Sequence, residues 1–275
     1  MDFWKPLLGF LATEATAPEA YGLYHIIWLA LIAGLTVFAV LQGRKHNAQT
    51  VNRVVFLTAV VVFALEIYKQ IVFTFGDGSG EASYAWYAFP FQFCSTPMYV
   101  GLLLGIFRKG RVRQMLQSYL SCYALFAGLA VMLYPNDVYI ATVGINIQTM
   151  VCHGSMVVIG GYLLGSGQVK LEWKTLLKAM PVFAVCVAIA ATLNEVAYRV
   201  GILQEHTFNM FFISPYLECT LPVYNLVHNA VPFPLNLILY ILGFTAAAGL
   251  ILLLCKGLQL LFHTMQQRIG RLATT

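Results

Sequence analysis

The sequence predicts an all-α, polytopic membrane protein folded as a seven-helix transmembrane bundle. Of the 275 residues, 60% are hydrophobic and only 10% are charged, and the mean hydropathy is +0.76. Soluble domains are instead about 45–50% apolar and about 25% charged. Seven separate apolar runs are each long enough to cross a bilayer core, which needs about 20 helical residues. We expect residues 1–275 to form a single transmembrane domain.

The predicted spans follow one another with short connections, except for one long loop before the last span. They lie at about 23–42, 53–75, 88–107, 114–134, 144–165, 176–199 and 233–255. Residues 3–13 are apolar but too short to span. No cleavable signal is evident, because the first long apolar run is too long for a signal-peptide core and follows an acidic lead. The polar-aromatic loop at about 200–232 is either an interfacial lid or a connector.

Charge divides the connections into two sides. The basic side holds Arg44, Lys45, Arg53, Arg108, Lys109, Arg111, Arg113, Lys170, Lys174, Lys178, Lys256, Arg268 and Arg271, opposed only by Glu172. The acidic side holds Asp2, Glu14, Glu19, Asp77, Glu81, Asp137, Glu205 and Glu218, with only Lys5. The positive-inside rule therefore predicts an outside N-terminus and a cytoplasmic C-terminus in the plasma membrane. Because topology accounts for the net charge of +5, no nucleic-acid partner is implied.

Two charged pairs lie inside predicted spans. Glu66 and Lys69 are spaced i,i+3 in the second span, and Glu195 and Arg199 are spaced i,i+4 in the sixth. Both spacings place the partners on one helix face. Ionisable groups in a span usually face the bundle interior, a pathway or a site. They are therefore candidate site residues, although either pair could serve structure alone.

The polar residues of the spans gather at one depth. With the predicted orientation, the outer halves contain His25, Glu66, Lys69, Gln70, Gln92, Cys94, Asn146, Gln148, Thr149, His153, Asn194, Glu195, Tyr198 and Asn236. The inner halves are almost purely aliphatic. We therefore expect a polar cavity in the outer-leaflet half of the membrane.

The stretch FPFQFCSTPMY at 89–99 opens the third span with polar residues between two prolines. Pro97 cannot donate to the carbonyl of Phe93, so the helix should bend beside Cys94. A cysteine needs a base to form a nucleophilic thiolate, and His153 is the only histidine well inside a span. The alternatives are that Cys94 is a packing residue and His153 a hydrogen-bonded structural group.

The remaining motifs favour structure over chemistry. Apart from Cys94, the cysteines are Cys122, Cys152, Cys186, Cys219 and Cys255, and the six form no CxxC pair, which argues against a disulfide framework or a zinc site. The pair Gly161 and Gly165 matches the small-xxx-small pattern of close helix packing. No cofactor or metal is expected.

Several short motifs together resemble the YwaF-type integral membrane protein family, related to transmembrane protein 164. They are Tyr24-His25-Ile26-Ile27-Trp28, Glu66, FPFQFCS at 89–95, His153, Asn194 and Asn209-Met-Phe-Phe-Ile-Ser-Pro215. The resemblance covers roughly residues 20–262. Lys69 and the Glu195–Arg199 pair are not placed in the family pattern.

The resemblance implies a cysteine-dependent phospholipid acyltransferase that works without acyl-CoA. Cys94 would be the nucleophile and His153 the base, and phospholipids and lysophospholipids would be the substrates. Amides such as Gln92, Asn146 or Asn194 would hydrogen-bond the oxyanion.

Two other functions stay open from the residues. A lipid ester hydrolase would pass the acyl chain to water, as the distantly related androgen-induced-type hydrolases do with a Thr/His pair. A transporter or receptor would use Glu66, Lys69, Glu195 and Arg199 along a solute or proton path. The sequence does not identify the acyl chain, the acceptor, the oligomeric state or the physiological role.

Overall fold

The computed structural model describes residues 4–76, 81–135, 138–228 and 230–272, and these ranges are all-α. Asp2, Asp77 and Asp137, which contribute to the predicted acidic side, lie outside them. The helices are α1 (Trp4–Leu11), α2 (Leu23–Gly43), α3 (Ala48–Phe75), α4 (Thr96–Ile106), α5 (Gly110–Tyr119), α6 (Leu125–Leu133), α7 (Val143–Gly165), α8 (Trp173–Arg199), α9 (Tyr224–His228) and α10 (Phe233–Leu272). A π-helical segment, Leu120–Ala124, joins α5 to α6.

Six helices in the described ranges are long and apolar enough to cross a membrane. They are Leu23–Gly43, Ala48–Phe75, Gly110–Leu133, Val143–Gly165, Trp173–Arg199 and Phe233–Leu261. They coincide with six of the seven predicted spans, and they fit a membrane-embedded, multi-pass protein. Hydropathy and the length of the apolar runs were therefore sufficient to locate these helices.

The third predicted span, 88–107, is the exception. Its helical part, Phe93–Ile106, is shorter than the other spans, and regular α-helix begins only at Thr96. Pro97 lies in the first turn of α4, where a missing N–H costs nothing. The prediction of a bend was therefore wrong, because the helix begins here. The side chain of Thr96 donates to the Phe93 carbonyl instead, at 2.8 Å.

Small residues on α6 and α7 bring three helices close together. The α2 helix packs along α7, where a Cβ on Gly165 would lie 2.7 Å from the Val40 backbone. The predicted close packing at Gly161 and Gly165 is therefore confirmed. A Cβ on Gly128 of α6 would lie 2.7 Å from the carbonyl oxygen of His153, so this glycine lets α6 approach α7 beside that histidine.

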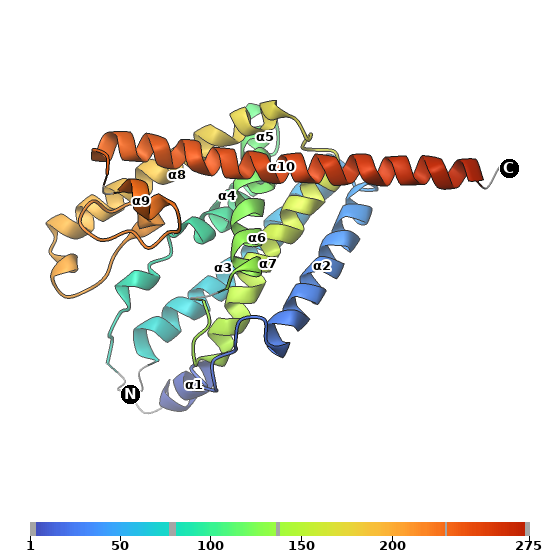
Figure 1. Ribbon diagram of the computed structural model, residues 1–275. Helices are drawn as coiled ribbons and strands as arrows, with labels where there is room; N and C mark the ends of the chain where they lie inside the picture. Colours follow the sequence, from blue (N-terminus) through green and yellow to red (C-terminus); the bar gives the residue numbers. More distant parts are fainter. Residues whose placement is uncertain (1–3, 77–80, 136–137, 229, 273–275) are drawn as a thin grey trace.

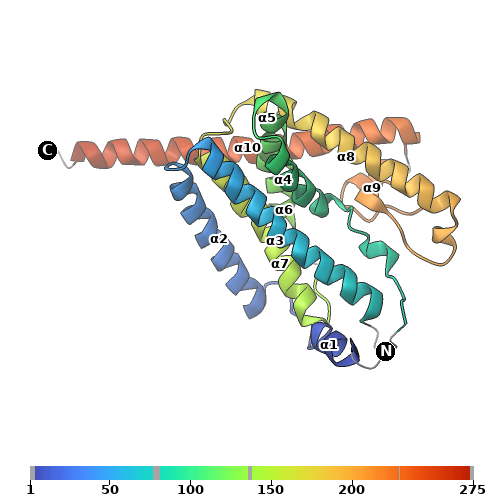
Figure 2. The same cartoon turned by 180° about the vertical axis from the view of Figure 1, so that it is seen from behind.

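The helices diverge toward one end of the molecule. Helices α8 and α10 run away from α3 and α7, while the C-terminal half of α10 extends past the other helices (Figures 1 and 2). The irregular segments around residues 81–95 and 200–228 lie at the diverging ends (Figures 1 and 2). We call α8 with the N-terminal half of α10 one arm, and α3 with α7 the other. The two irregular segments lie between these arms (Figures 1 and 2).

Aromatic rings form much of the core between the arms. Phe183 of α8 stacks on Tyr123 with ring centroids 4.4 Å apart and lies 5.2 Å from Phe93. Phe211, from the loop before α10, stacks on Phe93 at 5.6 Å. The loop therefore contributes to the core, and the ring beside Cys94 is fixed by packing on both sides.

Two amide side chains hold this loop in the bundle. Gln92 donates to the Asn209 carbonyl and accepts from the Phe211 N–H, both at 3.0 Å. Asn194 accepts from the Met210 N–H at 2.7 Å and donates to the Met210 carbonyl at 3.0 Å. Phe211 has φ 58°, a conformation that is costly for a bulky residue and needs such support. The loop is thus an integral, buried part of the fold at this point.

Candidate functional site

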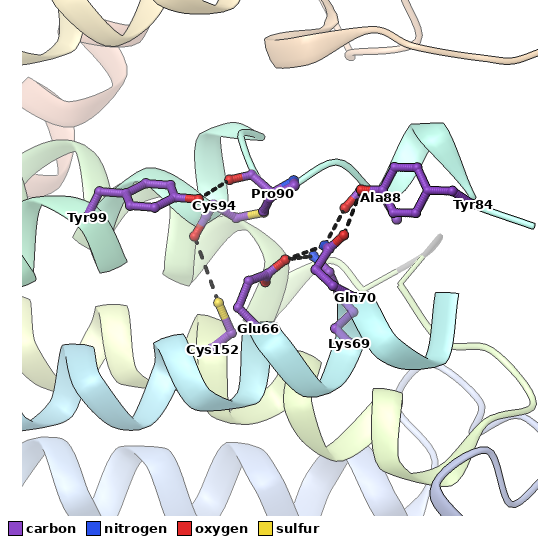
Figure 3. A network of polar contacts seen from close by, with 9 residues as sticks. All are labelled: Glu66, Lys69, Gln70, Tyr84, Ala88, Pro90, Cys94, Tyr99 and Cys152. Atoms are coloured by element: carbon purple, nitrogen blue, oxygen red, sulfur yellow. Dashed lines mark hydrogen bonds and ion pairs between the residues drawn. The ribbon is translucent and has the colours of Figure 1, made fainter. Parts of the chain in front are cut away.

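The candidate site begins with a buried ion pair on α3. The Lys69 ammonium lies 2.7 Å from the Glu66 carboxylate, and the two side chains are 16% and 7% exposed. The Gln70 amide donates to the same carboxylate oxygen at 2.7 Å. The i,i+3 and i,i+4 spacings bring all three groups to one helix face, as the sequence predicted for the pair. Figure 3 shows these side chains projecting from α3 toward the segment that carries Cys94.

The segment between Tyr84 and Cys94 is mostly irregular, and side chains satisfy its backbone. Gln70 donates to the Ala88 carbonyl at 2.9 Å, and Tyr99 donates to the Pro90 carbonyl at 2.7 Å (Figure 3). Irregular backbone is tolerated at membrane depth where protein groups replace its missing partners. These bonds therefore fix the approach of the chain to Cys94.

Tyr84 completes the chain of contacts from α3. Its hydroxyl donates to the Gln70 side-chain oxygen at 2.6 Å. Burial, together with the nearby Glu66 charge, raises the pKa of Tyr84 to about 12. The phenol therefore remains protonated, and remains a donor, at physiological pH.

The Cys94 thiol and the His153 imidazole are hydrogen-bond partners. Cys94 lies in the short helical turn Phe93–Ser95 and is partly exposed, whereas His153 lies on α7 and is 7% exposed. The charges of Lys69 and Glu66 also act on the thiol. The structure thus brings together a thiol, an imidazole and an ammonium from three separate elements.

The tautomer of His153 follows from its second contact. Ring atom Nδ1 lies 2.8 Å from the Thr149 carbonyl oxygen. A carbonyl can only accept, so Nδ1 carries the proton and Nε2 of the neutral ring has the lone pair. A histidine in this state accepts a proton from a neighbouring thiol, as a general base must.

Cys152, next to His153 on α7, contacts Cys94 through a different group. Its thiol points at the Cys94 carbonyl oxygen, 3.8 Å away (Figure 3). Both cysteines line a small cavity of about 20 Å³ whose other walls include Val62, Met98 and Ile159. This volume is about that of one water molecule, so apolar packing nearly closes the space beyond the thiol. All six cysteines are described and free.

The amides expected to bind an oxyanion have other partners. Gln92 and Asn194 hold the Met210 loop, as described above. Asn146 accepts from the Ile140 N–H at 3.0 Å and donates to the Ile140 carbonyl at 2.7 Å. The structure therefore uses these three amides to fix irregular backbone. Gln148 is also buried on α7.

His25 is likewise engaged elsewhere. It is fully buried, its Nδ1 accepts from the Tyr21 N–H at 3.0 Å, and its Nε2–H donates to the Met132 carbonyl at 2.9 Å. Asn236 donates to the His228 carbonyl at 2.8 Å. Both residues tie helix ends to neighbouring segments, and neither contributes a free polar group to the Cys94 cluster.

The Glu195–Arg199 pair forms a separate surface cluster. The guanidinium lies 2.6 Å from the carboxylate, and the two side chains are 75% and 39% exposed for Arg199 and Glu195. Tyr216 donates to Glu195 at 2.5 Å, which raises the pKa of the Tyr216 phenol, and its ring stacks on Tyr198 at 3.7 Å. This exposed pair has a different setting from the buried pair on α3.

Sequence reasoning missed Cys152, Tyr84, Tyr99 and the carbonyl of Thr149 as members of the site. The i,i+4 spacing of Thr149 and His153 was a usable signal, although it pointed to the side chain rather than the backbone. The other three contacts join different elements, so no spacing along the chain could have found them.

We expect Glu66 and Lys69 to be strongly coupled in stability. Removing one partner leaves the other charge buried and unpaired, which typically costs about 3–5 kcal/mol. Glu66→Gln and Lys69→Met should therefore each lower Tm. The double variant should lower it by less than the sum of the two single losses. A double-mutant cycle of thermal unfolding measures this coupling. Additive losses would contradict it, and Glu195→Gln with Arg199→Met provides the exposed matched control.

The fold and the site together define a multi-pass helical membrane protein with a cysteine–histidine pair beside a buried ion pair. A model of the TMEM164 family matches residues 20–256, and the chain belongs to that family. The relation to transmembrane protein 164 predicted from the sequence motifs is thereby confirmed. No curated protein and no solved structure matches the chain.

Proposed function

We propose that this protein is an acyltransferase that moves a fatty acyl chain from a phospholipid to an acceptor through an acyl-Cys94 intermediate. The observation that supports this most is the hydrogen-bonded contact between the Cys94 thiol and the His153 imidazole. The Thr149 carbonyl orients the imidazole in the tautomer that a base requires. The location of the site in a helical membrane protein favours a lipid ester as the substrate.

The proposed reaction has two half-reactions of the same kind. In the first, Nε2 of His153 takes the thiol proton while the Cys94 sulfur attacks the ester carbonyl carbon. The tetrahedral intermediate then loses its C–O bond, and His153 returns the proton to the departing lysophospholipid oxygen. A thioester on Cys94 and a lysophospholipid result.

In the second half-reaction the acceptor replaces the lysophospholipid. His153 takes a proton from the acceptor hydroxyl, whose oxygen attacks the thioester, and the C–S bond breaks to restore the Cys94 thiolate, which regains the proton. A lysophospholipid acceptor gives a remodelled phospholipid, and another amine or hydroxyl acceptor gives a different acyl product. With water as acceptor, the same residues would make the enzyme a hydrolase.

Lys69 is the best-placed group to stabilise the developing oxyanion. Gln92, Asn146 and Asn194 have backbone partners, whereas the Lys69 ammonium has three donors and one ion-pair contact to Glu66. Its charge acts on the Cys94 thiol from within the same cluster. A fixed positive charge in a water-poor site lowers the energy of a developing negative charge.

The acyl-enzyme itself tests this function. We expect purified protein incubated with mixed phospholipids to gain the mass of one acyl chain, which hydroxylamine then removes. Adding labelled lysophospholipid should transfer the chain to it, whereas a hydrolase would release free fatty acid. Intact-mass spectrometry and lipid analysis measure these outcomes. If no lipid acylates the protein, the proposal fails, and liposome flux assays on the Glu66–Lys69 pair would test transport.

We also propose seven membrane crossings, with an outside N-terminus, a cytoplasmic C-terminus and the Cys94 site in the outer-leaflet half of the plasma membrane. The sorting of basic residues to one set of connections supports this orientation. The short helix Phe93–Ile106, together with the segment before it, would complete the seventh crossing.

The orientation predicts which cysteines react from outside the cell. Val223 in the long loop is 76% exposed, and Lys109 between α4 and α5 is also exposed. A membrane-impermeant maleimide should label Val223→Cys on intact cells and label Lys109→Cys only after permeabilisation. The reverse pattern would overturn the orientation.

A further inference from the structure

A second cavity lies at the end of α3 opposite to the Cys94 cluster. Its volume is about 1020 Å³, and the start of α3, the end of α4 and the start of α5 form its walls. Arg53, on this part of α3, is 13 positions before Glu66, which corresponds to about 20 Å along the helix axis. The cavity is therefore separate from the candidate active site.

Four cationic side chains line this cavity, and no acidic one does. They are Arg53, Arg108, Lys109 and Arg113. In the described part of the chain, none of the four forms an ion pair. In contrast, the ammonium of Lys69, near Cys94, is paired with the Glu66 carboxylate. Positive charge is thus concentrated in the cavity without an internal counter-charge.

Arg113 is held in place by neutral groups. Its Nε donates to the side-chain oxygen of Asn52 at 3.2 Å, and its Nη2 donates to that of Gln168 at 2.6 Å. Asn52 is 7% exposed, so this arginine is anchored at the wall. A guanidinium fixed by neutral acceptors keeps its full charge for an external anion.

Apart from the neutral polar side chains of Gln49 and Asn52, the rest of the wall is apolar and includes Phe56, Leu57 and Leu104. A free inorganic anion gains nothing from such a surface, whereas a phospholipid offers both a charged head group and acyl chains. The positive-inside rule explains the sign of the charges but not their concave arrangement over an apolar wall. Basic pockets between transmembrane helices are suited to anionic lipid head groups.

We propose that this cavity binds the phosphate head group of an anionic phospholipid from the leaflet at that end of the bundle. Arg53, Arg108, Lys109 and Arg113 hold the phosphate, and the acyl chains lie along Phe56 and Leu104. This site is independent of the acyl transfer proposed at Cys94.

Thermal unfolding of the purified full chain in detergent tests the proposal. Dioleoyl phosphatidylglycerol should raise Tm in a saturable way. Dioleoyl phosphatidylcholine and inorganic phosphate, at the same concentrations, should not. Arg53→Gln with Arg108→Gln should weaken the apparent affinity about twenty-five-fold, because each basic residue contributes about a factor of five at an anionic lipid surface.

Lys174→Gln with Lys178→Gln is the matched control. It removes the same charge from the start of α8, outside the cavity, and should leave the phosphatidylglycerol titration unchanged. The single variant Lys109→Gln, with an expected five-fold loss, serves if the double variant folds poorly. Equal effects of the two double variants would overturn the site. An equal rise in Tm with phosphatidylcholine would overturn the requirement for an anionic head group. An equal rise in Tm with inorganic phosphate would overturn the proposal that the ligand is a lipid.

Discussion

Cys94→Ala should abolish both the acyl adduct and acyl transfer, because it removes the thiol that bonds the His153 imidazole. Cys152, the nearest other cysteine, is buried and its thiol is directed at the Cys94 carbonyl rather than at His153. The loss should reach the detection limit in intact-mass and lipid-transfer assays. Folding should be retained, since the substitution removes one sulfur atom from a partly exposed position.

The other cysteines provide the controls for this experiment. Cys122 is fully buried between α5 and α6, and Cys255 lies on α10, so neither reaches the site. Cys122→Ala and Cys255→Ala should be acylated at the wild-type rate, and we expect the same for Cys186→Ala and Cys219→Ala. Full lipid-remodelling activity in Cys94→Ala would contradict the acyl-cysteine mechanism.

His153→Ala should slow acylation of Cys94 by roughly 10²–10⁴-fold, the usual loss when a general base is removed. Without the histidine as base, only the fraction of Cys94 that is already in the thiolate form would react. The acylation rate of the variant should therefore rise about tenfold per pH unit below the thiol pKa. A stopped time course of adduct formation at several pH values measures both effects.

A structural role for His153 would give a different pattern. Loss of packing would lower Tm and reduce the rate equally at every pH, whereas loss of a base leaves the steep pH dependence. His46→Ala is the matched control, because His46 bonds a tyrosine hydroxyl, Tyr162, away from Cys94. Acylation of His153→Ala at the wild-type rate would remove the histidine from the mechanism.

The sequence by itself determined the helices and the contacts within them. Six predicted spans correspond to helices, because a bilayer requires long apolar runs whose length and composition are visible in any one stretch of chain. The Glu66–Lys69 ion pair and the close packing at Gly161 and Gly165 also followed from spacing along a single helix.

The third span and the long loop showed the limits of local reasoning. Hydropathy predicted helix through 88–95, but regular α-helix begins only at Thr96, and Gln70 and Tyr99 bond the backbone of Ala88 and Pro90. The long loop inserts Phe211 into the core because Gln92 and Asn194 bond its backbone. Such bonds depend on which elements meet, and no periodicity encodes that.

Only the tertiary structure decided the partners of the polar groups. It places the thiol of Cys94 against the imidazole of His153, which the sequence could suggest only from their similar depth and the family resemblance. In the structure, the side chains of Asn146 and Asn194 form hydrogen bonds with backbone groups, whereas the charge of Lys69 acts on the Cys94 thiol. The physical reason is that a helix fixes neighbours three or four residues apart, whereas contacts between helices depend on their packing, rotation and depth.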